Sequence, residues 1–241
     1  MSNPLEQFKI KKLIPLDLGA VDISFTNAAL FMLIAVALVL ILFIVALRNP
    51  AVIPSRIQNV GEIFFEFISD LLKEFLGEEG RKYFPFIFST FIFVLFCNLL
   101  GMLPYAFTVT SQIVVTFGLG ISIFIIINII AFVRNGFSFF SFFLPSGVPM
   151  IMAPMMIFIE LFSYLARPVS LSVRLTANMI AGHVLLKVLA GFVIMMGLTS
   201  GWLPIPVVSI LIGFEIFVAV LQAYIFTILI CVYLSDAVHM H

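Results

Sequence analysis

The sequence predicts an all-α integral membrane protein, and three observations lead to this fold class. Of the 241 residues, 63% are hydrophobic and 10% are charged, whereas a soluble domain carries about 25% charged residues. The mean hydropathy is +1.27. Several apolar runs also reach the roughly 20 residues that a helix needs to cross a hydrocarbon core of about 30 Å. We therefore predict about five membrane helices plus an amphipathic interfacial helix, in one membrane domain over residues 25–241 that follows an amino-terminal segment, 1–24.

The first predicted span covers residues 25–47, which hold no charged residue and are followed by the helix-ending sequence RNP. Residues 1–24 are polar and broken by prolines, unlike a signal peptide, so we expect this first apolar run to be retained. From 55 to 82 the apolar residues recur at helical spacing, and charged residues take the other positions. This pattern predicts an amphipathic helix in the interface plane, with a soluble helical linker as the alternative. Its charged residues are Glu62, Glu66, Asp70, Lys73 and Glu74.

The next spans are predicted at 84–103 and 113–133, and the link between them, 104–112, holds no Lys or Arg. Basic residues gather instead between the first two spans and at Arg134. The positive-inside bias therefore puts those two regions on the cytoplasmic or matrix side and the amino terminus outside, although Lys9, Lys11 and Lys12 argue mildly against it. The basic residues between the first two spans are Arg48, Arg56, Lys73, Arg81 and Lys82.

The last two apolar runs, 150–196 and 205–236, are longer than an upright span requires. The first would form a helix about 70 Å long. Such helices must tilt steeply, bend or run partly along the membrane. Pro154 and Pro168 permit a bend, and residues 197–206 supply a turn, so the sequence predicts a long, tilted hairpin.

Ionisable residues lie inside these two runs, and each charge at the bilayer centre costs at least about 2.5 kcal/mol. At 100° per residue, six polar or small residues fall within roughly 40° of Arg174 and form one narrow stripe with it. His183 and Lys187 lie on the opposite side of the helix. Glu215 and Gln222 share a face of the last helix, with Tyr233 aligned beyond them. Two such facing helices would suit a proton path. The stripe comprises Glu160, Ser163, Arg167, Ser170, Asn178 and Ala181.

Simpler roles stay open for several of these residues. Arg167 could be anchored at a headgroup, Lys187 could extend to the interface, and His183 could be an interhelical packing residue. Cys97 and Cys231 lie in apolar runs without a second ligand at metal-binding spacing, so we expect no disulfide and no metal site. The terminal HMH (239–241) has too few ligands for a metal and is interpreted as a solvated tail.

Several sequence stretches resemble subunit a of F-type ATP synthase, part of the Fo sector, of the mitochondrial or closely related bacterial type. The principal stretches are ARPVSLSVRLTANMIAGHVLL and GFEIFVAVLQAYIFTILICVYLSDA. The likeness extends to FCNLLGMLPYAFTVTS, to ISFTNAALFML and to the opening PLEQF, and so covers nearly the whole chain.

The resemblance implies a stator subunit with two offset proton half-channels that lead to the carboxylates of a c-subunit ring, against which the final hairpin packs. It implies that Arg174 is the essential arginine, which couples proton flow to ring rotation and prevents a proton leak. It also implies roles in proton translocation for Asn178 and Gln222, and for His183 and Glu215, a histidine and an acidic residue that exchange positions among family members. We expect His183 and Glu215 to form a relay on the outer entry side, with Glu160 as a weaker candidate for the same path. The expected partners are the c ring, a b-type peripheral stalk, other Fo subunits and the lipid bilayer.

The resemblance further implies a non-catalytic subunit without a cofactor, in a mitochondrial inner membrane or a bacterial plasma membrane. A net charge of zero gives no reason to expect a nucleic-acid partner. A sodium-driven member of the same family is the closest alternative. A secondary transporter would show internal repeats, and a membrane metalloenzyme would need a cluster such as HExxH; neither is found in the sequence.

Overall fold

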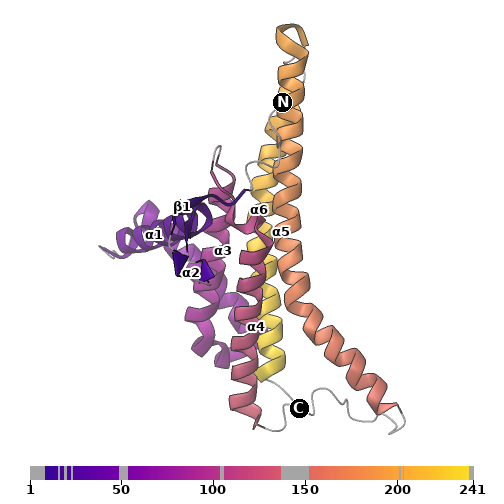
Figure 1. Cartoon of the computed structure of the whole chain (residues 1–241). Helices are drawn as coiled ribbons and strands as arrows, with labels where there is room; N and C mark the ends of the chain where they lie inside the picture. The colour runs from indigo at the N-terminus through magenta and orange to yellow at the C-terminus, as the bar shows by residue number, and fades with distance from the viewer. Residues whose placement is uncertain are drawn as a thin grey trace.

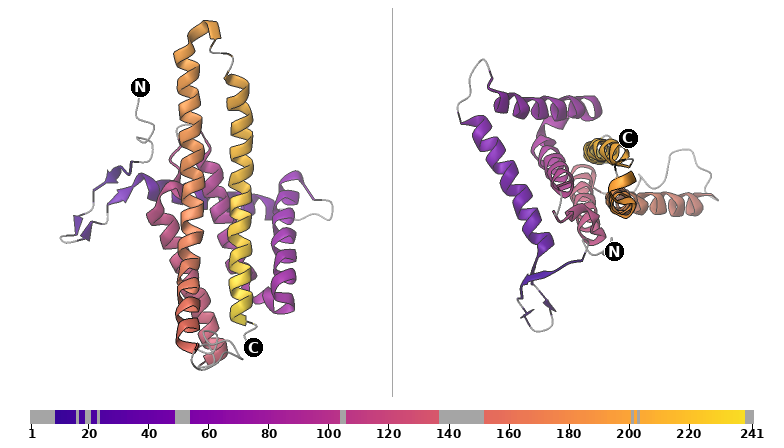
Figure 2. Two further views of the ribbon diagram at one scale, coloured as in Figure 1. Left: turned by 90° about the vertical axis from the view of Figure 1, so that its right-hand side faces the viewer. Right: turned by 90° about the horizontal axis from the view of Figure 1, so that it is seen from above.

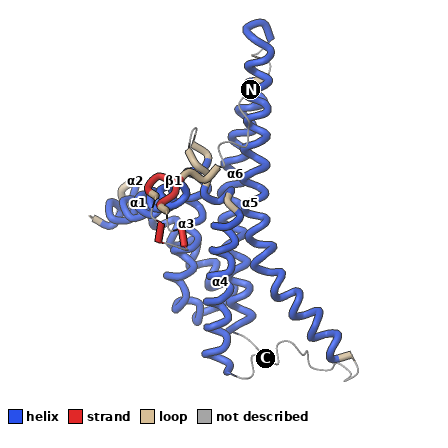
Figure 3. The backbone as a smooth tube through the Cα atoms, in the orientation of Figure 1, coloured by secondary structure: helices blue, strands red, loops and turns tan. Residues whose placement is uncertain are grey.

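The computed structural model of the chain describes residues 9–15, 17–18, 21–22, 24–48, 54–103, 106–136, 152–200, 202 and 204–238. Helices dominate this part of the chain (Figure 3), and five helical segments in it are long and apolar enough to cross a membrane. The predicted all-α fold class with about five membrane helices is therefore confirmed. The helices are α1 (Asn27–Leu47), α2 (Arg56–Leu76), η2 (Gly77–Tyr83), α3 (Phe84–Gly101), η3 (Val109–Ser111), α4 (Ile113–Asn135), α5 (Ala153–Ser200) and α6 (Ile205–Val238).

Short strands precede α1, which the sequence analysis did not predict. They are β1 (Lys12–Ile14), β2 (Asp17–Leu18), β3 (Val21–Asp22) and β4 (Phe25–Thr26); β1 pairs antiparallel with β4, and β2 with β3. The helix begins at Asn27 rather than at Phe25, because the Thr26 hydroxyl accepts a hydrogen bond from the backbone N–H of Ala29. This is the bond expected of an N-cap threonine.

The predicted amphipathic helix over 55–82 divides into α2 and the 3₁₀ helix η2. The division falls at Gly77, whose φ of 62° is a conformation that glycine adopts without strain. Ile68, Leu71 and Leu72 of α2 are buried, whereas all five of its charged residues named above are exposed. The amphipathic pattern thus separates the buried apolar residues named here from the exposed charged residues of α2. The location of α2 in the interface plane stays a prediction.

The main core lies where α3, α4 and α6 meet, with α2 covering one side. Val94 of α3, Ile127 of α4 and Phe226 of α6 belong to this cluster and are almost fully buried. The bounds of α3 and α4 differ by two residues from the predicted spans, since α3 ends at Gly101 and α4 continues to Asn135. Other helices surround the second half of α6, whereas its first half is largely exposed.

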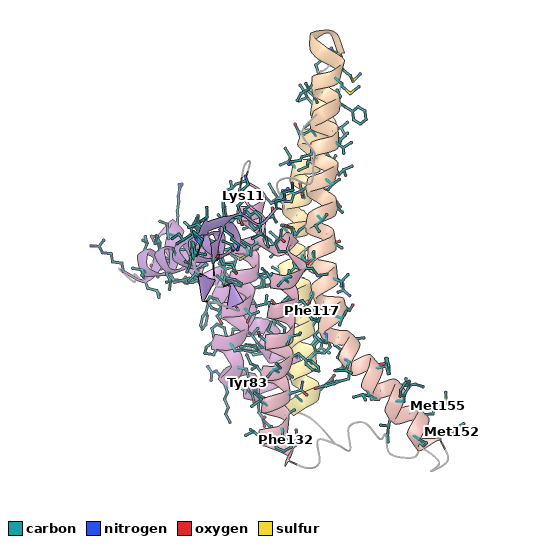
Figure 4. The ribbon with its side chains drawn as sticks, in the orientation of Figure 1. Lys11, Tyr83, Phe117, Phe132, Met152 and Met155 are labelled. Carbon is teal, nitrogen blue, oxygen red and sulfur yellow. The ribbon has the colours of Figure 1, made fainter. Side chains whose placement is uncertain are left out.

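The helices α5 and α6 run side by side as a long antiparallel hairpin (Figures 1 and 2). With 48 residues, α5 would measure roughly 72 Å if straight. It bends, and its lower arm leaves α4 and α6 with Met152 and Met155 near its outer end (Figure 4). Pro168 lies inside this helix, and a proline kinks a helix because it lacks the N–H and clashes with a preceding carbonyl. Residues 150–151 of the predicted span lie outside the described residues.

The direction of α1 bears on the predicted tilt of the hairpin. Seen from above, α1 lies lengthwise across the view, whereas the upper parts of α5 and α6 are seen end-on (Figure 2). These elements therefore cannot all stand upright in one flat bilayer. If α1 crosses it upright, the hairpin is steeply inclined, so the steep tilt stays a prediction with this geometric support.

Candidate functional site

One polar cluster joins the middle of α5 to α6 and to the turn η3. His183 Nδ1 lies 3.9 Å from Glu215 Oε1, and the two side chains are only 12% and 7% exposed. On the other side of the ring, His183 Nε2 lies 3.0 Å from the Thr108 hydroxyl. The two residues that the sequence analysis paired are therefore neighbours in the structure. Whether they act as a relay stays a prediction.

A glycine lets Glu215 approach α5 so closely. A Cβ atom added to Gly182 would overlap the carboxylate of Glu215, with its Cδ at 2.9 Å and its Cγ at 3.1 Å as well as Oε1. A methyl group at position 182 would therefore push the Glu215 side chain away from His183. The sequence analysis did not identify this requirement, because it concerns the distance between two helices.

Several buried polar atoms around this pair have no hydrogen-bond partner within the described residues. They are Asn98 Oδ1, Thr110 Oγ1 and both carboxylate oxygens of Glu215. Asn98 is held in place by its Nδ2, which donates to the carbonyl of Ala219, one turn beyond Glu215 on α6. Buried polar groups normally bond to protein or to water, and these atoms are available to water. We call His183, Glu215, Thr108, Thr110 and Asn98 the first polar cluster.

A second polar cluster lies at the bend of α5. Arg167 Nη1 donates to Asp236 Oδ2 over 3.2 Å, and its guanidinium stands over the rings of Tyr164 and Tyr233 at 5.2 and 4.8 Å. Tyr164 in turn donates its hydroxyl to Asn128 Oδ1 over 2.6 Å. Residues of α4, α5 and α6 line a cavity of about 20 Å³ at this cluster, which is room for about one water molecule. Arg167, Asp236, Tyr164, Tyr233 and Asn128 form this second polar cluster.

Arg174 lies on α5 between the two clusters, and its side chain is exposed on the surface of the chain. One turn further on, Asn178 Nδ2 donates to Gln222 Oε1 over 3.0 Å, which joins two of the predicted site residues across the hairpin. An exposed arginine on a membrane helix is costly unless an opposite charge approaches it. The exposed side of Arg174 is therefore a place where another chain can supply a carboxylate.

Glu160 lies apart from these contacts. Glu160 is on the lower arm of α5, about 35 Å along the helix from His183 if the helix were straight, so the structure does not bring it to the first polar cluster. Lys187 is exposed one turn beyond His183. No group of three or more His, Cys, Asp or Glu residues that could hold a metal occurs in the described ranges. The HMH tail lies outside them.

The sequence analysis missed Thr108, Asn98 and Asp236 as members of the clusters. Asp236 carries the clearest signal, because a lone aspartate near the end of an apolar helix needs a partner. Thr108 and Asn98 give no such signal, since threonine and asparagine are common beside helix ends and within membrane bundles. Arg167, for which headgroup anchoring was left open, instead binds within the protein.

Helices of spanning length, with a histidine and a glutamate in contact between two of them, define the class as a multi-pass membrane protein with ionisable groups inside its helix bundle. Residues 29–235 match the sequence profile of the family described as ATP synthase A chain. The match covers most of the sequence, so the chain belongs to this family. It is therefore a membrane-sector subunit that works with other ATP synthase subunits.

Replacing Gly182 by alanine tests the close contact with Glu215. We expect the added methyl group to displace the carboxylate from His183 and to lower ion-driven ATP synthesis by the assembled complex about ten-fold, a change of about 1.4 kcal/mol in the barrier. The rate is measured in membrane vesicles after assembly has been verified. Gly191→Ala is the matched control, because no atom lies within 4 Å of a Cβ at that position of the same helix. Equal rates for the two variants would contradict the proposed steric requirement.

Proposed function

We propose that the chain is the stator subunit that carries protons through two offset half-channels to the carboxylates of a c-subunit ring, and that Arg174 separates the half-channels. The observation that carries this proposal is the position of Arg174. It is exposed on α5, about 10 Å along the helix from Arg167 and about 14 Å from His183. An always-charged residue thus stands between the two polar clusters.

The two clusters lie toward opposite ends of the bundle, which supports access from opposite sides of the membrane. The second cluster adjoins the end of α4, where Asn135 Nδ2 donates to the carbonyl of Ala237 and Arg134 pairs with Glu79. Basic residues gather at this end, so the positive-inside bias makes it the inner side. The first cluster adjoins the link after α3, which holds no Lys or Arg, and so belongs to the outer side.

Arg174 explains why protons would have to travel with the ring. A carboxylate 4 Å from the guanidinium gains about 4 kcal/mol at an effective dielectric constant of 20, equivalent to roughly three pKa units. A passing carboxyl group would therefore lose its proton beside Arg174. The guanidinium itself does not deprotonate and cannot pass that proton on. Because each charge that crosses the membrane gains about 2.3 kcal/mol per 100 mV, this barrier makes the energy available only through rotation.

His183 favours protons over sodium as the transported ion. Free imidazole exchanges a proton near neutral pH, and Glu215 supplies a second proton-exchanging group 3.9 Å away. Sodium would call for a set of oxygen ligands rather than an imidazole ring. We place the uptake path at this pair and assign Asn178 and Gln222 to the region between it and Arg174. Glu160, beyond Arg167, is assigned to the inner side.

The proposal also covers the partners and the membrane. The exposed side of Arg174 would face the c ring, and the outward faces of α1 and α2 remain for a b-type peripheral stalk and other Fo subunits. The membrane would be an energy-transducing one, either a mitochondrial inner membrane or a bacterial plasma membrane. ATP itself would be made elsewhere in the complex, so the chain needs no nucleotide site.

Replacing Arg174 by glutamine tests the central role. We expect Arg174→Gln to abolish proton-driven ATP synthesis while the complex still assembles, because the exposed side chain contributes electrostatics rather than packing. The measurement is ATP synthesis in vesicles under an imposed proton gradient, with subunit content determined in parallel. Arg81→Gln is the control, since it removes another exposed arginine that lies outside the proposed path. Full coupled synthesis in Arg174→Gln would refute the mechanism.

If His183 and Glu215 act as one unit, their substitutions should have non-additive effects on the rate of ATP synthesis. Each single change, His183→Ala or Glu215→Ala, should slow proton-driven synthesis, because the remaining group loses its partner in the path. The double variant should be much less impaired than the product of the two losses. The exchanged pair, His183→Glu with Glu215→His, should recover part of the rate. The measurement is a double-mutant cycle of synthesis rates.

Two outcomes together would show that these residues are not one unit. The losses of the single variants would simply multiply, and the exchanged pair would be no faster than the slower single variant. His183 would then be an interhelical packing residue, the simpler interpretation that its sequence context allows.

A further inference from the structure

The hydroxyl of Thr108 makes two contacts, and together they fix the positions of protons in the first polar cluster. Its Oγ1 lies 3.3 Å from the carbonyl oxygen of Gly101 and 3.0 Å from Nε2 of His183. A carbonyl oxygen only accepts, so the single hydroxyl proton of Thr108 is directed to Gly101. Both contacts are hydrogen bonds at once only if His183 Nε2 carries a hydrogen and donates it to Thr108.

We infer that Thr108 is a positioning residue that holds neutral His183 as the Nε2–H tautomer and so leaves Nδ1 as the nitrogen that takes up and releases a proton. This inference rests on the proposed function and goes beyond it, because it names the atom through which the relay works. Nδ1 is the nitrogen that faces Glu215 Oε1. When the proton passes, the O–H bond of the Glu215 carboxyl group breaks and an N–H bond forms at Nδ1, which leaves a carboxylate and an imidazolium.

The local fold holds Thr108 rigidly enough for this role. Thr108 precedes η3, and its carbonyl accepts hydrogen bonds from both the hydroxyl and the backbone N–H of Ser111, at 2.6 and 3.3 Å. The residue is 4% exposed. A Cβ atom at Gly101 would lie 2.6 Å from Thr108 Cγ2, so only glycine lets this side chain approach the end of α3. The ring of His183 therefore meets an acceptor whose position is set by the backbone.

The charges around His183 are consistent with this assignment. Glu215 faces the ring from α6, and Lys187 lies one turn further along α5. The described residues that η3 and α3 bring to the cluster, Thr108, Thr110 and Asn98, are uncharged. The Nε2 side of the ring therefore meets a neutral acceptor and the Nδ1 side meets the carboxyl group. The opposite tautomer would turn an N–H bond toward Glu215 and leave the proton-accepting nitrogen against Thr108.

The activity test compares three variants of the intact complex in vesicles. Thr108→Val should slow proton-driven ATP synthesis about 2- to 10-fold, the effect of losing one hydrogen bond that holds the correct tautomer. Thr108→Ser keeps the hydroxyl and should restore the rate. Thr90→Val is the matched control, because it is the same substitution at another buried threonine, whose hydroxyl donates to the Phe86 carbonyl within α3 and which belongs to neither polar cluster. A normal rate in Thr108→Val, an equal loss in Thr90→Val or a failure of Thr108→Ser would overturn the inference.

A second comparison asks whether Thr108 acts through His183. In a His183→Ala background, Thr108→Val should cause no further loss of rate, because there is no ring left to orient. If Thr108→Val slows synthesis by the same factor in both backgrounds, its effect is on the fold of η3 and the inference is wrong.

A spectroscopic measurement separates this inference from the proposed function. Subunit carrying ¹⁵N-histidine, with His239→Gln and His241→Gln so that His183 is its one histidine, is assembled into unlabelled complex in lipid. The ¹⁵N shifts of neutral His183 should show the hydrogen on Nε2, and Thr108→Val should allow the other tautomer. A hydrogen on Nδ1 in the parent complex would overturn the assignment. If His183→Ala leaves synthesis unchanged, the relay of the proposed function fails, and the ¹⁵N shifts still decide the tautomer.

Discussion

The cost of placing charge and unpaired polar groups inside a bilayer is the constraint on which the arrangement of α5 and α6 depends. A charged side chain at the membrane centre costs several kcal/mol, and each unpaired buried polar group adds to that cost. The chain offsets this free-energy cost in three ways. Arg167 is compensated within the protein by Asp236 and two tyrosine rings. His183 is held between Thr108 and Glu215. In the proposed function, a carboxylate of the c ring would compensate the exposed Arg174.

The close packing of the hairpin follows from the same constraint. Glu215 reaches His183 only because Gly182 has no side chain. In the same way Gly120 of α4 lets that helix approach α5, where an added Cβ would lie 2.5 Å from Ser172 Oγ. The Ser172 hydroxyl therefore lies 3.0 Å from the Thr116 carbonyl of α4 as well as 2.7 Å from the Pro168 carbonyl of its own helix, and its single proton can be donated to either. Small residues thus let polar side chains find backbone acceptors that lipid could not provide, as is typical of helix packing in membranes.

The sequence alone predicts the helices of this chain more fully than it predicts the residues of the candidate site. The apolar runs predicted the helices because spanning length and charge depletion are local properties, and the excess length of the last two runs predicted the hairpin. The spacing of 100° per residue placed Arg174 and Asn178 on one side of a single helix and His183 on the other, and all three lie on α5. This pattern could not identify Thr108 or Gly182, whose contacts arise only when separate helices pack. The strands before α1 were missed because their two- and three-residue pairs leave no periodic pattern.

The central claim is that the two polar clusters open to opposite sides of the membrane and that Arg174 separates them. Thiol accessibility tests it most directly, in an assembled complex whose Cys97 and Cys231 have been replaced by alanine. The substitution Thr110→Cys places a thiol in the first polar cluster, and Asn128→Cys places one in the second. With a charged, membrane-impermeant thiol reagent, the account predicts that Thr110→Cys reacts only from the outer side and Asn128→Cys only from the inner side. Reaction of either cysteine from both sides, or of both from the same side, would contradict it.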